Sequence, residues 1–403
     1  MEKRVLLVNK FYYPRGGDCI VTLNTEALLR DKEMEVGIYA MQYPENIDYQ
    51  YSNYFASQIS FSGGIGAKVK ALKRTMGMGD VKTSFSRLLD DFKPRVVHLH
   101  NIHSYLSPAL AEMAHKRGLH VVWTLHDYKL LCPAYTCTRD DKPCELCYRD
   151  KSHVLRNKCM KGSTVASLIA WLEAKRWNRE RIERSTDAFI CPSQFMASKM
   201  EQGGFDKRKL HVLNNFVDPT KLERFKAQDL GPRKDYYCYV GRLSHEKGVE
   251  TLLRAAALLP MELRIAGTGP LAEQLREHYA SHTHIKFLGH LNARQVSALL
   301  AEARFSVIPS QCYENNPLSV IESLCSGTPV VGARIGGIPE LIDETSGMPY
   351  AWNDGHALAE ALERAWEKPW DYASIKATAI ARFSPEAHYR QLMRIYEYPV
   401  PAL

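Results

Sequence analysis

The 403-residue sequence contains no long apolar run. No stretch approaches the roughly 18 apolar residues that a helix needs to span a bilayer. The opening Met-Glu-Lys-Arg-Val-Leu-Leu-Val-Asn is typical of a strand, because its apolar run is too short for a signal peptide. We therefore expect a cytoplasmic protein, in which cysteines stay reduced.

Low-complexity segments and short-period repeats are also missing, which argues against fibrous, solenoid and disordered proteins. Hydrophobic residues make up 45% and charged residues 24%, as in ordinary globular proteins. A chain of this length is too long to fold around one hydrophobic core of ordinary size, so we expect two domains.

Positive charge is unevenly distributed along the chain. Through Leu210 there are 33 Lys and Arg against 23 Asp and Glu, and the remainder has 20 against 22. An anionic membrane surface would fit the basic first half, and so would a solvated basic face. No recognised aromatic-basic module accompanies the charge, so we expect no nucleic-acid partner.

Short apolar runs alternate with helical patterns, which indicates parallel sheets covered on both faces and an α/β fold class. We expect strands at 4–9, 95–100, 121–125, 187–191 and 211–214, and a second series at 236–240, 262–266, 285–288, 305–309 and 329–332. Each half thus predicts its own doubly wound sheet. The expected domains are 1–215 and 216–384, and the expected helix from 385 crosses back to the first domain.

The loop from Lys10 to Gly17 follows the first strand, and Asp18 is expected to cap the next helix. Strand, glycine loop and helix N-terminus form a geometry that can cradle phosphate. Gly16-Gly17 alone is weak evidence, because a tight turn needs the same residues.

A basic amphipathic helix is predicted between Gly64 and Asp80. Apolar residues recur there at helical spacing, and lysines occupy other positions. Such a helix could lie on a membrane, at the cytoplasmic face of an inner membrane, or it could simply pack on its domain.

Glu314 and Glu322 stand on either side of a predicted helix N-terminus. Asn316 is expected at the N-cap, Pro317 at the first helical position and Gly327 just beyond the helix end. The first turn would then present N–H groups to an anion. The simpler alternative is a capped helix with two surface glutamates.

Arg242 and Lys247 lie on one loop after a predicted strand, at the carboxyl edge where open α/β sheets bind ligands. An Arg fork and a Lys point charge suit a diphosphate, although a structural ion pair would also explain them. His126 follows another strand and could hydrogen-bond a sugar hydroxyl. His98 is expected to pack and hydrogen-bond, and His103 could contact an acceptor.

Five of the ten cysteines fall between residues 132 and 159. A structural zinc ion held by Cys132, Cys144, Cys147 and Cys159 is chemically reasonable in a loop with little apolar content. The alternative is a set of reduced thiols, and a redox CxxC lacks a thioredoxin-like context.

Several motifs of the second half occur in the order and spacing of one family. They are Tyr-Val-Gly-Arg-Leu-Ser-His-Glu-Lys-Gly at 239–248, Leu-Arg-Ile-Ala-Gly-Thr-Gly-Pro at 263–270, the Glu314/Glu322 pair and Gly-Thr-Pro-Val-Val-Gly at 327–332. In these the chain resembles the retaining glycosyltransferases of family 4. That resemblance implies the GT-B fold, in which two Rossmann-like domains face each other across a cleft.

The resemblance also implies roles for individual residues. Arg242, Lys247, Glu314 and His126 match catalytic positions, and no covalent nucleophile is implied. The implied donor-binding residues are Gly16, Gly17, Gly241, Arg242, Lys247, Gly267, Glu314, Asn316, Leu318, Ser319 and Glu322. Asn315 and Asn316 depart from many members, which places the identity of the sugar in doubt.

The implied activity is retaining, metal-independent transfer of a sugar from a nucleotide-diphosphate sugar, UDP more than GDP, to a saccharide or lipid-linked acceptor. The cysteine-rich insert resembles that of enzymes of bacterial surface-polysaccharide assembly. A GT-B nucleotide-sugar epimerase and a non-catalytic nucleotide-sugar-binding protein are the alternatives.

Overall fold

The computed structural model describes residues 3–61, 63–140 and 142–398. The chain divides into two compact units. The first contains Met1–Cys137, Cys144–Asn214 and the segment from His388, and the second contains Thr138–Pro143 and Asn215–Ala387. Each unit is built on its own six-stranded sheet.

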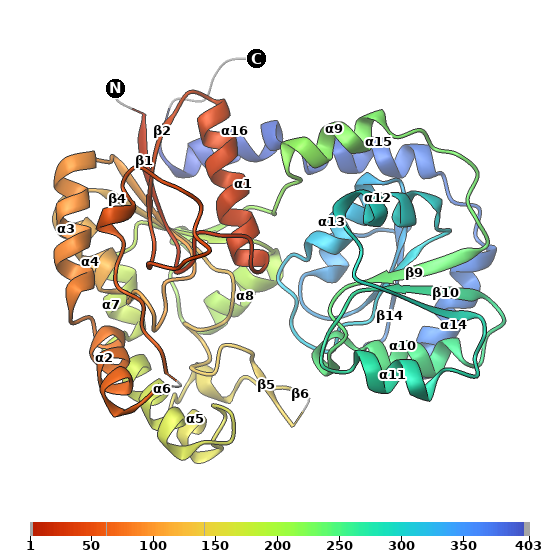
Figure 1. Ribbon diagram of the computed structural model, residues 1–403, viewed down its shortest axis with the longest axis horizontal. Coiled ribbons are helices and arrows are strands. Elements are labelled where there is room, and N and C mark those ends of the chain that lie inside the picture. The colour runs from red at the N-terminus through yellow and green to blue at the C-terminus, as the bar shows by residue number, and fades with distance from the viewer. Residues whose placement is uncertain (1–2, 62, 141, 399–403) are drawn as a thin grey trace. The chain divides into compact units, whose positions relative to one another are not determined.

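The sheet of the first unit is parallel throughout and has the order β2-β1-β3-β4-β7-β8. Its strands are β1 (Arg4–Val8), β2 (Glu35–Tyr39), β3 (Val96–Leu99), β4 (His120–Thr124), β7 (Ala188–Cys191) and β8 (Leu210–Val212). Figure 1 shows α3 (Asp80–Phe92) and α4 (Ala109–Lys116) on one side of this sheet and α1 (Gly17–Asp31) on the other. Helices on both faces explain why β1 is apolar without alternation.

Shorter elements complete the first unit. They are η1 (Ser52–Tyr54), α2 (Ile65–Thr75), η2 (Leu146–Tyr148), α5 (His153–Arg156), α6 (Thr164–Arg176), α7 (Arg179–Arg184), α8 (Gln194–Gln202) and η3 (Lys207–Lys209). The two-residue strands β5 (Thr138–Arg139) and β6 (Lys142–Pro143) pair with each other and are grouped with the second unit.

The last helix, α16 (Pro385–Ile395), ends against the first sheet. The His98 ring lies between the Tyr396 hydroxyl, 2.6 Å from Nδ1, and the Thr124 hydroxyl, 2.7 Å from Nε2. His120 Nε2 lies 2.9 Å from the Ile395 carbonyl oxygen. The prediction that His98 packs and hydrogen-bonds is confirmed.

The second unit repeats the architecture with the parallel order β11-β10-β9-β12-β13-β14. Its strands are β9 (Tyr236–Val240), β10 (Glu262–Ala266), β11 (Ile285–Gly289), β12 (Ser306–Ile308), β13 (Val330–Ala333) and β14 (Gly347–Tyr350). Its helices are α9 (Pro219–Ala227), η4 (His245–Lys247), α10 (Val249–Ala256), α11 (Ala272–His278), α12 (Ala293–Glu302), α13 (Leu318–Cys325), η5 (Ile338–Glu340), α14 (Gly355–Glu367) and α15 (Tyr372–Arg382).

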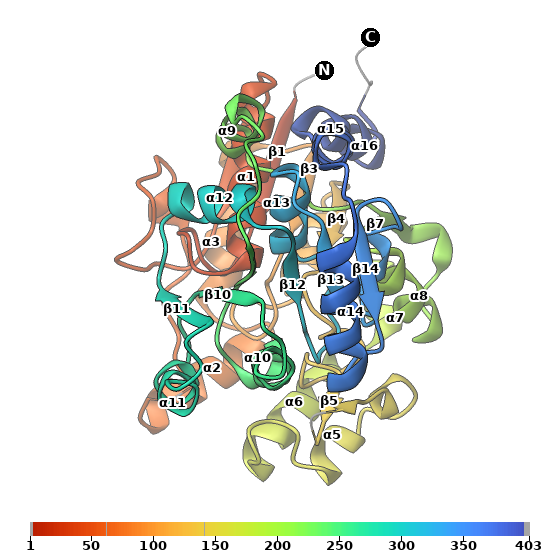
Figure 2. The same ribbon diagram turned by 90° about the vertical axis from the view of Figure 1, so that its right-hand side faces the viewer.

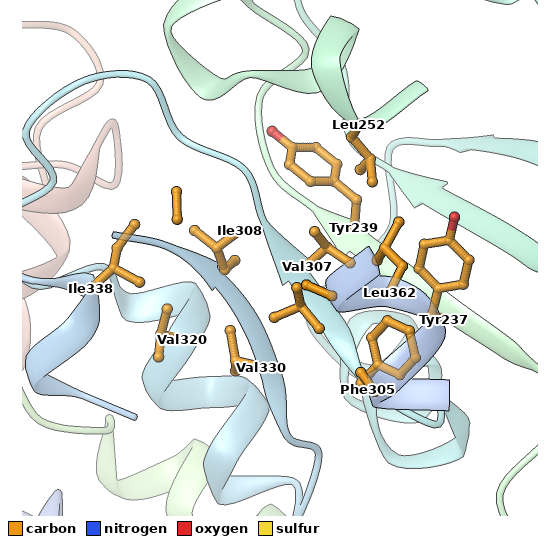
Figure 3. Packing of buried hydrophobic residues seen from close by; sticks show 14 of the residues in the cluster. Tyr237, Tyr239, Leu252, Phe305, Val307, Ile308, Val320, Val330, Ile338 and Leu362 are labelled. Atoms are coloured by element: carbon orange, nitrogen blue, oxygen red, sulfur yellow. The ribbon is translucent and has the colours of Figure 1, made fainter. Parts of the chain in front are cut away.

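One large apolar cluster holds the second unit together. Tyr237 of β9 stacks on Phe305 with ring centroids 5.1 Å apart, and both side chains are fully buried (Figure 3). Leu362 of α14 belongs to the same cluster, and Figure 2 shows α14 beside α10. The cluster keeps the strand ends, and the loops that follow them, in fixed positions.

The expected strands are present, and so is the α/β architecture with two sheets. Two further strands, β2 and β14, were not expected. Both lie at an edge of their sheet. Pro349 within β14 is tolerated there, because an edge strand has one side with no ladder to support.

One helix prediction needs correction. Asp18 does not cap α1: Gly16 occupies the N-cap, and Asp18 lies in the first turn. The short basic helix expected between Gly64 and Asp80 is present as α2, with Gly64 at its N-cap, and the prediction is confirmed. Arg74 in its last turn is buried and bonds the Asp80 carboxylate and the Ser57 and Tyr105 carbonyls. Within the described part of the chain, no helix is both long enough and apolar enough to cross a bilayer.

The buried histidines predict acid lability of the first unit. Burial lowers the pKa of His98 to about 3 and that of His388 to about 4, from 6.5. Below pH 6.5 these two histidines are therefore protonated in the unfolded chain but stay neutral in the folded unit. The free energy of unfolding that they contribute is present at neutral pH and is lost as the pH falls toward 4. Each such group costs about 1.4 kcal/mol per pH unit across this window.

We expect the His98→Gln variant to lose less stability than wild type between pH 7 and pH 5, measured as thermal melting midpoints at each pH. His115→Gln is the control, because the His115 side chain is 45% exposed and lies outside this network. Equal pH slopes for wild type and His98→Gln would contradict this account.

Candidate functional site

The carboxyl edge of the second sheet carries a pocket of about 390 Å³. It lies where β9, β10 and β11 end. Its lining residues are Val240, Gly241, Arg242, Ala266, Gly267, Thr268, Gly269, His290, Leu291 and Val296. The structure thus brings the predicted donor residues Gly241, Arg242 and Gly267 together in one pocket.

Main-chain packing between two loops forms the wall of this pocket. Gly267 has φ +143°, and a Cβ there would lie 1.9 Å from the Gly241 carbonyl oxygen. Gly269 lies as closely against Leu243, where a Cβ would approach the carbonyl oxygen to 2.3 Å. Glycine is required at both positions because no side chain fits between the two loops.

Lys247 and Glu314 form the central ion pair of the site. Their Nζ and Oε1 atoms are 2.6 Å apart, and the Ser310 hydroxyl donates to the same Oε1 at 2.7 Å. Burial disfavours the charged amine, but the Glu314 carboxylate outweighs this and raises the pKa of Lys247. Lys247 therefore remains a cation, and the carboxylate is held in one orientation.

Close main-chain contacts position both partners. Gly248, after Lys247, has φ +69°, and a Cβ there would lie 1.8 Å from the Pro309 carbonyl oxygen. Gly336 has φ +61° and would place a Cβ 2.2 Å from the Glu314 carbonyl oxygen, which accepts a 2.7 Å hydrogen bond from Gly337 N–H. Gly336-Gly337 thus supports Glu314, a role that the sequence did not reveal.

The helix after Glu314 begins one residue later than expected. Its N-cap is Pro317, and Leu318 is its first residue, so Asn316 is not the cap. The Asn316 side chain instead accepts a hydrogen bond from Asn215 N–H at 2.8 Å. Leu318 and Ser319 are in the first turn as predicted, where N–H groups have no acceptor within the helix.

The far end of the helix agrees with the prediction. Gly327 follows the Ser326 C-cap with φ +74°, the left-handed position expected of it. Between the two ends, the Glu322 carboxylate lies 2.5 Å from Lys221 Nζ of α9. No local pattern indicates Lys221, because α9 lies about a hundred residues earlier in the chain.

The remaining predicted residues lie in the first unit. Gly16 and Gly17 begin α1, and Asp18 of its first turn accepts a 2.9 Å hydrogen bond from Asn101 and lies 3.8 Å from Lys10 Nζ. Burial raises the pKa of Asp18, but His126, Lys10 and Asn101 together lower it further than burial raises it. Asp18 is therefore an ionised carboxylate beside the glycine loop.

His126 belongs to the same cluster of polar groups. Its Nε2 lies 2.9 Å from His100 Nδ1, and the two rings stack. Burial lowers the pKa of His126 to about 4, despite the opposing charge of Asp18. His126 is thus a neutral imidazole at physiological pH, and His103 stacks on Trp123 nearby in this unit.

The four cysteines predicted to hold zinc lie in the insert between Cys132 and Cys159. Among residues 3–61, 63–140 and 142–398, no three His, Cys, Asp or Glu side chains are placed to hold a metal ion. The Cys132 thiol hydrogen-bonds the thiols of Cys137 and Cys147. The Cys159 thiol faces the His153 carbonyl oxygen at 4.0 Å, and zinc binding by the four cysteines stays a prediction.

Two family descriptions match the chain, one to each half. "Glycosyltransferase Family 4" covers residues 20–221, and "Glycosyl transferases group 1" covers residues 221–382. The second match contains the pocket, the Lys247–Glu314 pair and α13.

Curated relatives match mainly in part. The sulfoquinovosyl transferase SQD2 of Arabidopsis thaliana is 33% identical over 44% of this chain and 36% of its own length. The amylovoran biosynthesis glycosyltransferase AmsK of Erwinia amylovora is 27% identical over 56% of this chain and 60% of its own length. The chain thus spans less than two thirds of the length of these relatives.

Solved structures match over nearly the whole chain. Sucrose-phosphate synthase from Thermosynechococcus elongatus has a TM-score of 0.68 at 17% identity, with 98% of each chain covered. The Anabaena protein HepE in complex with UDP has a TM-score of 0.61 at 16% identity, covering 98% of this chain and 99% of HepE. These likenesses show the fold, and the family matches show the membership: the chain is a GT-B protein that belongs to glycosyltransferase family 4.

Proposed function

We propose that the protein is a retaining, metal-independent glycosyltransferase that moves a sugar from a nucleotide-diphosphate sugar to a saccharide or lipid-linked acceptor. The observation that carries the proposal is the Lys247–Glu314 pair beside the first turn of α13. It combines a fixed cation, a fixed carboxylate and unpaired helix N–H groups, which suit a diphosphate joined to a polyol.

The reaction needs stabilisation of the charge that builds on the departing diphosphate. Lys247, Arg242 and the positive end of α13 would supply it without a metal ion. Glu314 would accept hydrogen bonds from hydroxyls of the transferred sugar, and Glu322 from the ribose. No side chain is assigned as a covalent nucleophile.

The nucleoside would occupy the 390 Å³ pocket. Its wall combines main-chain groups of two glycine loops with the side chains of Leu291 and Val296, an apolar surface suited to a flat base. The structures of HepE contain UDP or UDP-glucose, and that of starch synthase IV contains ADP. We propose UDP as the carrier.

The first unit would bind the acceptor. Neutral His126 can exchange hydrogen bonds with a sugar hydroxyl. Gly16 and Gly17, exposed at the start of α1, stay predicted donor-binding residues. The name of AmsK refers to biosynthesis of amylovoran, and that of WcaL to colanic acid. We therefore propose an acceptor in the assembly of a surface polysaccharide.

The Lys247→Ala variant tests the assignment. We expect turnover of the nucleotide-sugar to fall about 100-fold or more while the fold is kept, because one fixed charge facing the leaving group is removed. Sugar transfer is measured with the donor that gives the largest thermal shift in a nucleotide-sugar screen.

Lys234→Ala is the matched control, since Lys234 pairs with Glu302 at the surface, 2.7 Å away. Wild-type-like turnover by Lys247→Ala would contradict the proposal. Conversion of the nucleotide-sugar without any acceptor would favour the epimerase instead.

Two helices of the first unit expose the apolar side chains that helices normally bury. In α2, Ile65 is 84% and Val69 is 46% exposed, while the buried positions are Ala71, Arg74 and Thr75. In α6 the stripe Val165, Leu168 and Leu172 is exposed at 68%, 40% and 39%, while Ser167, Ala170 and Glu173 are buried.

The two exposed stripes belong to neighbouring helices. The Trp177 indole at the end of α6 donates a 2.8 Å hydrogen bond to the Thr75 carbonyl at the end of α2, and Figure 1 shows the helices close together. Lys68, Lys70 and Lys73 are exposed on α2. Apolar side chains flanked by lysines suit the surface of an anionic bilayer, so we propose peripheral attachment at the cytoplasmic face of a membrane.

We expect the Ile65→Asp/Val165→Asp variant to bind anionic vesicles at least about tenfold more weakly, because inserting one such side chain is worth roughly 1.5–3 kcal/mol. Flotation with phosphatidylglycerol vesicles at low salt measures this. Leu258→Asp is the control, since Leu258 is 82% exposed but lies in the second unit. Equal retention of all three proteins would exclude the attachment surface.

A further inference from the structure

Asn215 begins the long segment of the second unit, and its two N–H donor groups bond one partner, Asn316. Its main-chain N–H donates to Asn316 Oδ1 at 2.8 Å. Its side-chain Nδ2 donates to the Asn316 carbonyl oxygen, also at 2.8 Å. The two residues are 101 positions apart in the chain, so this pair ties the start of the unit to the segment that leads into α13.

The pair fixes which way the Asn316 amide is turned. A main-chain N–H can only donate, so the atom that receives it must be the amide oxygen and not the nitrogen. Asn316 is 4% exposed, and within the described residues its Nδ2 has no hydrogen-bond partner. A buried donor left in this state is unfavourable in the unliganded protein, and a bound acceptor would relieve it.

The chemistry around Asn316 favours an anion as that acceptor. Asn316 lies directly before the Pro317 N-cap, so its amide adjoins a helix terminus with positive partial charge. The first-turn N–H groups of Leu318 and Ser319 are likewise donors without acceptors in the helix. A group with several negatively charged oxygens, such as a diphosphate, can accept from all three.

We propose that Asn215 is a positioning residue of the nucleotide-sugar site: by holding Asn316 at two points, it presents the remaining amide N–H of Asn316 to the donor diphosphate. This rests on the proposed function, which places the diphosphate at the tip of α13. Asn215 itself does not touch the ligand. Because Asn215 already holds the Asn316 side chain in one orientation, binding of the ligand does not have to restrict that side chain, and less conformational entropy is lost on binding.

The Asn215→Ala variant deletes the bond to the Asn316 carbonyl and leaves the main-chain bond. We expect its affinity for UDP and for inorganic pyrophosphate to fall about tenfold, measured by titration calorimetry well below the melting temperature. Pyrophosphate makes the result independent of the nucleobase. The result that overturns the proposal is wild-type affinity for both ligands.

Asn214→Ala is the matched control. The Asn214 Nδ2 also donates to a carbonyl oxygen at 2.8 Å, that of Pro192, and it makes no bond to Asn316. Loss of one such bond should lower the melting temperature of both variants, whereas only Asn215→Ala should lose affinity. Equal losses of affinity would show a general structural effect and would overturn the positioning role.

Asn316→Asp provides a second test that does not depend on Asn215. The substitution keeps an oxygen for the Asn215 N–H but replaces the amide donor with an anionic oxygen. We expect at least a hundredfold loss of pyrophosphate affinity and a much smaller loss for uridine, which carries no phosphate. Equal losses for the two ligands, or a wild-type protein that fails to bind pyrophosphate, would overturn the inference.

The outcome is separable from that of the proposed function. Binding that depends on Asn215 in a protein without transferase activity would refute the function alone. Sugar transfer with wild-type affinity in Asn215→Ala would refute the positioning role alone.

Discussion

The ion pair between Lys247 and Glu314 is the interaction on which the candidate site depends. A cation and a carboxylate that are both partly buried must be held closely, because desolvation would otherwise exceed their attraction. The structure meets this demand with main chain rather than with further side chains: Gly248 packs on Pro309, and Gly336 packs on Glu314. The Lys247 side chain stays 34% exposed and the Glu314 side chain 13% exposed.

The same need for close main-chain contact explains why glycines occupy key positions of the second unit. The 390 Å³ pocket exists because Gly267 and Gly269 let one loop rest directly on the main chain of another. Any side chain there would push apart the ends of β9 and β10. The fold thus sets the spacing of the charged groups through its backbone, and α13 adds N–H donors at the same sheet edge.

Much of this was predictable from the sequence, since buried parallel strands are short apolar runs between breakers. The strands that were missed, β2 and β14, are edge strands, and Gly347-Met348-Pro349-Tyr350 carries neither alternation nor a continuous apolar run. Glu314, Lys247 and Gly327 were recognised because each stands beside a strand end or helix end, where local sequence constrains the backbone. Capping preference misplaced Asn316, because a partner far along the chain uses its side chain.

Contacts between distant residues could not be predicted. Lys221 at Glu322, Asn215 at Asn316 and Gly336 at Glu314 each join segments that no local pattern relates. The cysteine cluster illustrates the same limit: spacing alone did not indicate that the Cys132 thiol contacts the thiols of Cys137 and Cys147. Sequence patterns therefore identified the charged groups, and the tertiary contacts decide how they are oriented.

The two units differ in the charge of their buried polar groups. This difference fits the proposal that the second unit binds the nucleotide-sugar and the first unit binds the acceptor. In the second unit, Lys247 pairs with Glu314 and Lys221 pairs with Glu322, and such charged groups suit a diphosphate. In the first unit, burial keeps His98 and His126 neutral, and the ionised Asp18 lies beside the glycine loop. A carboxylate, an amide and a neutral imidazole together match the hydroxyls of a sugar. These groups therefore suit the acceptor saccharide proposed for the first unit, and the place of Gly16 and Gly17 at the donor stays a prediction.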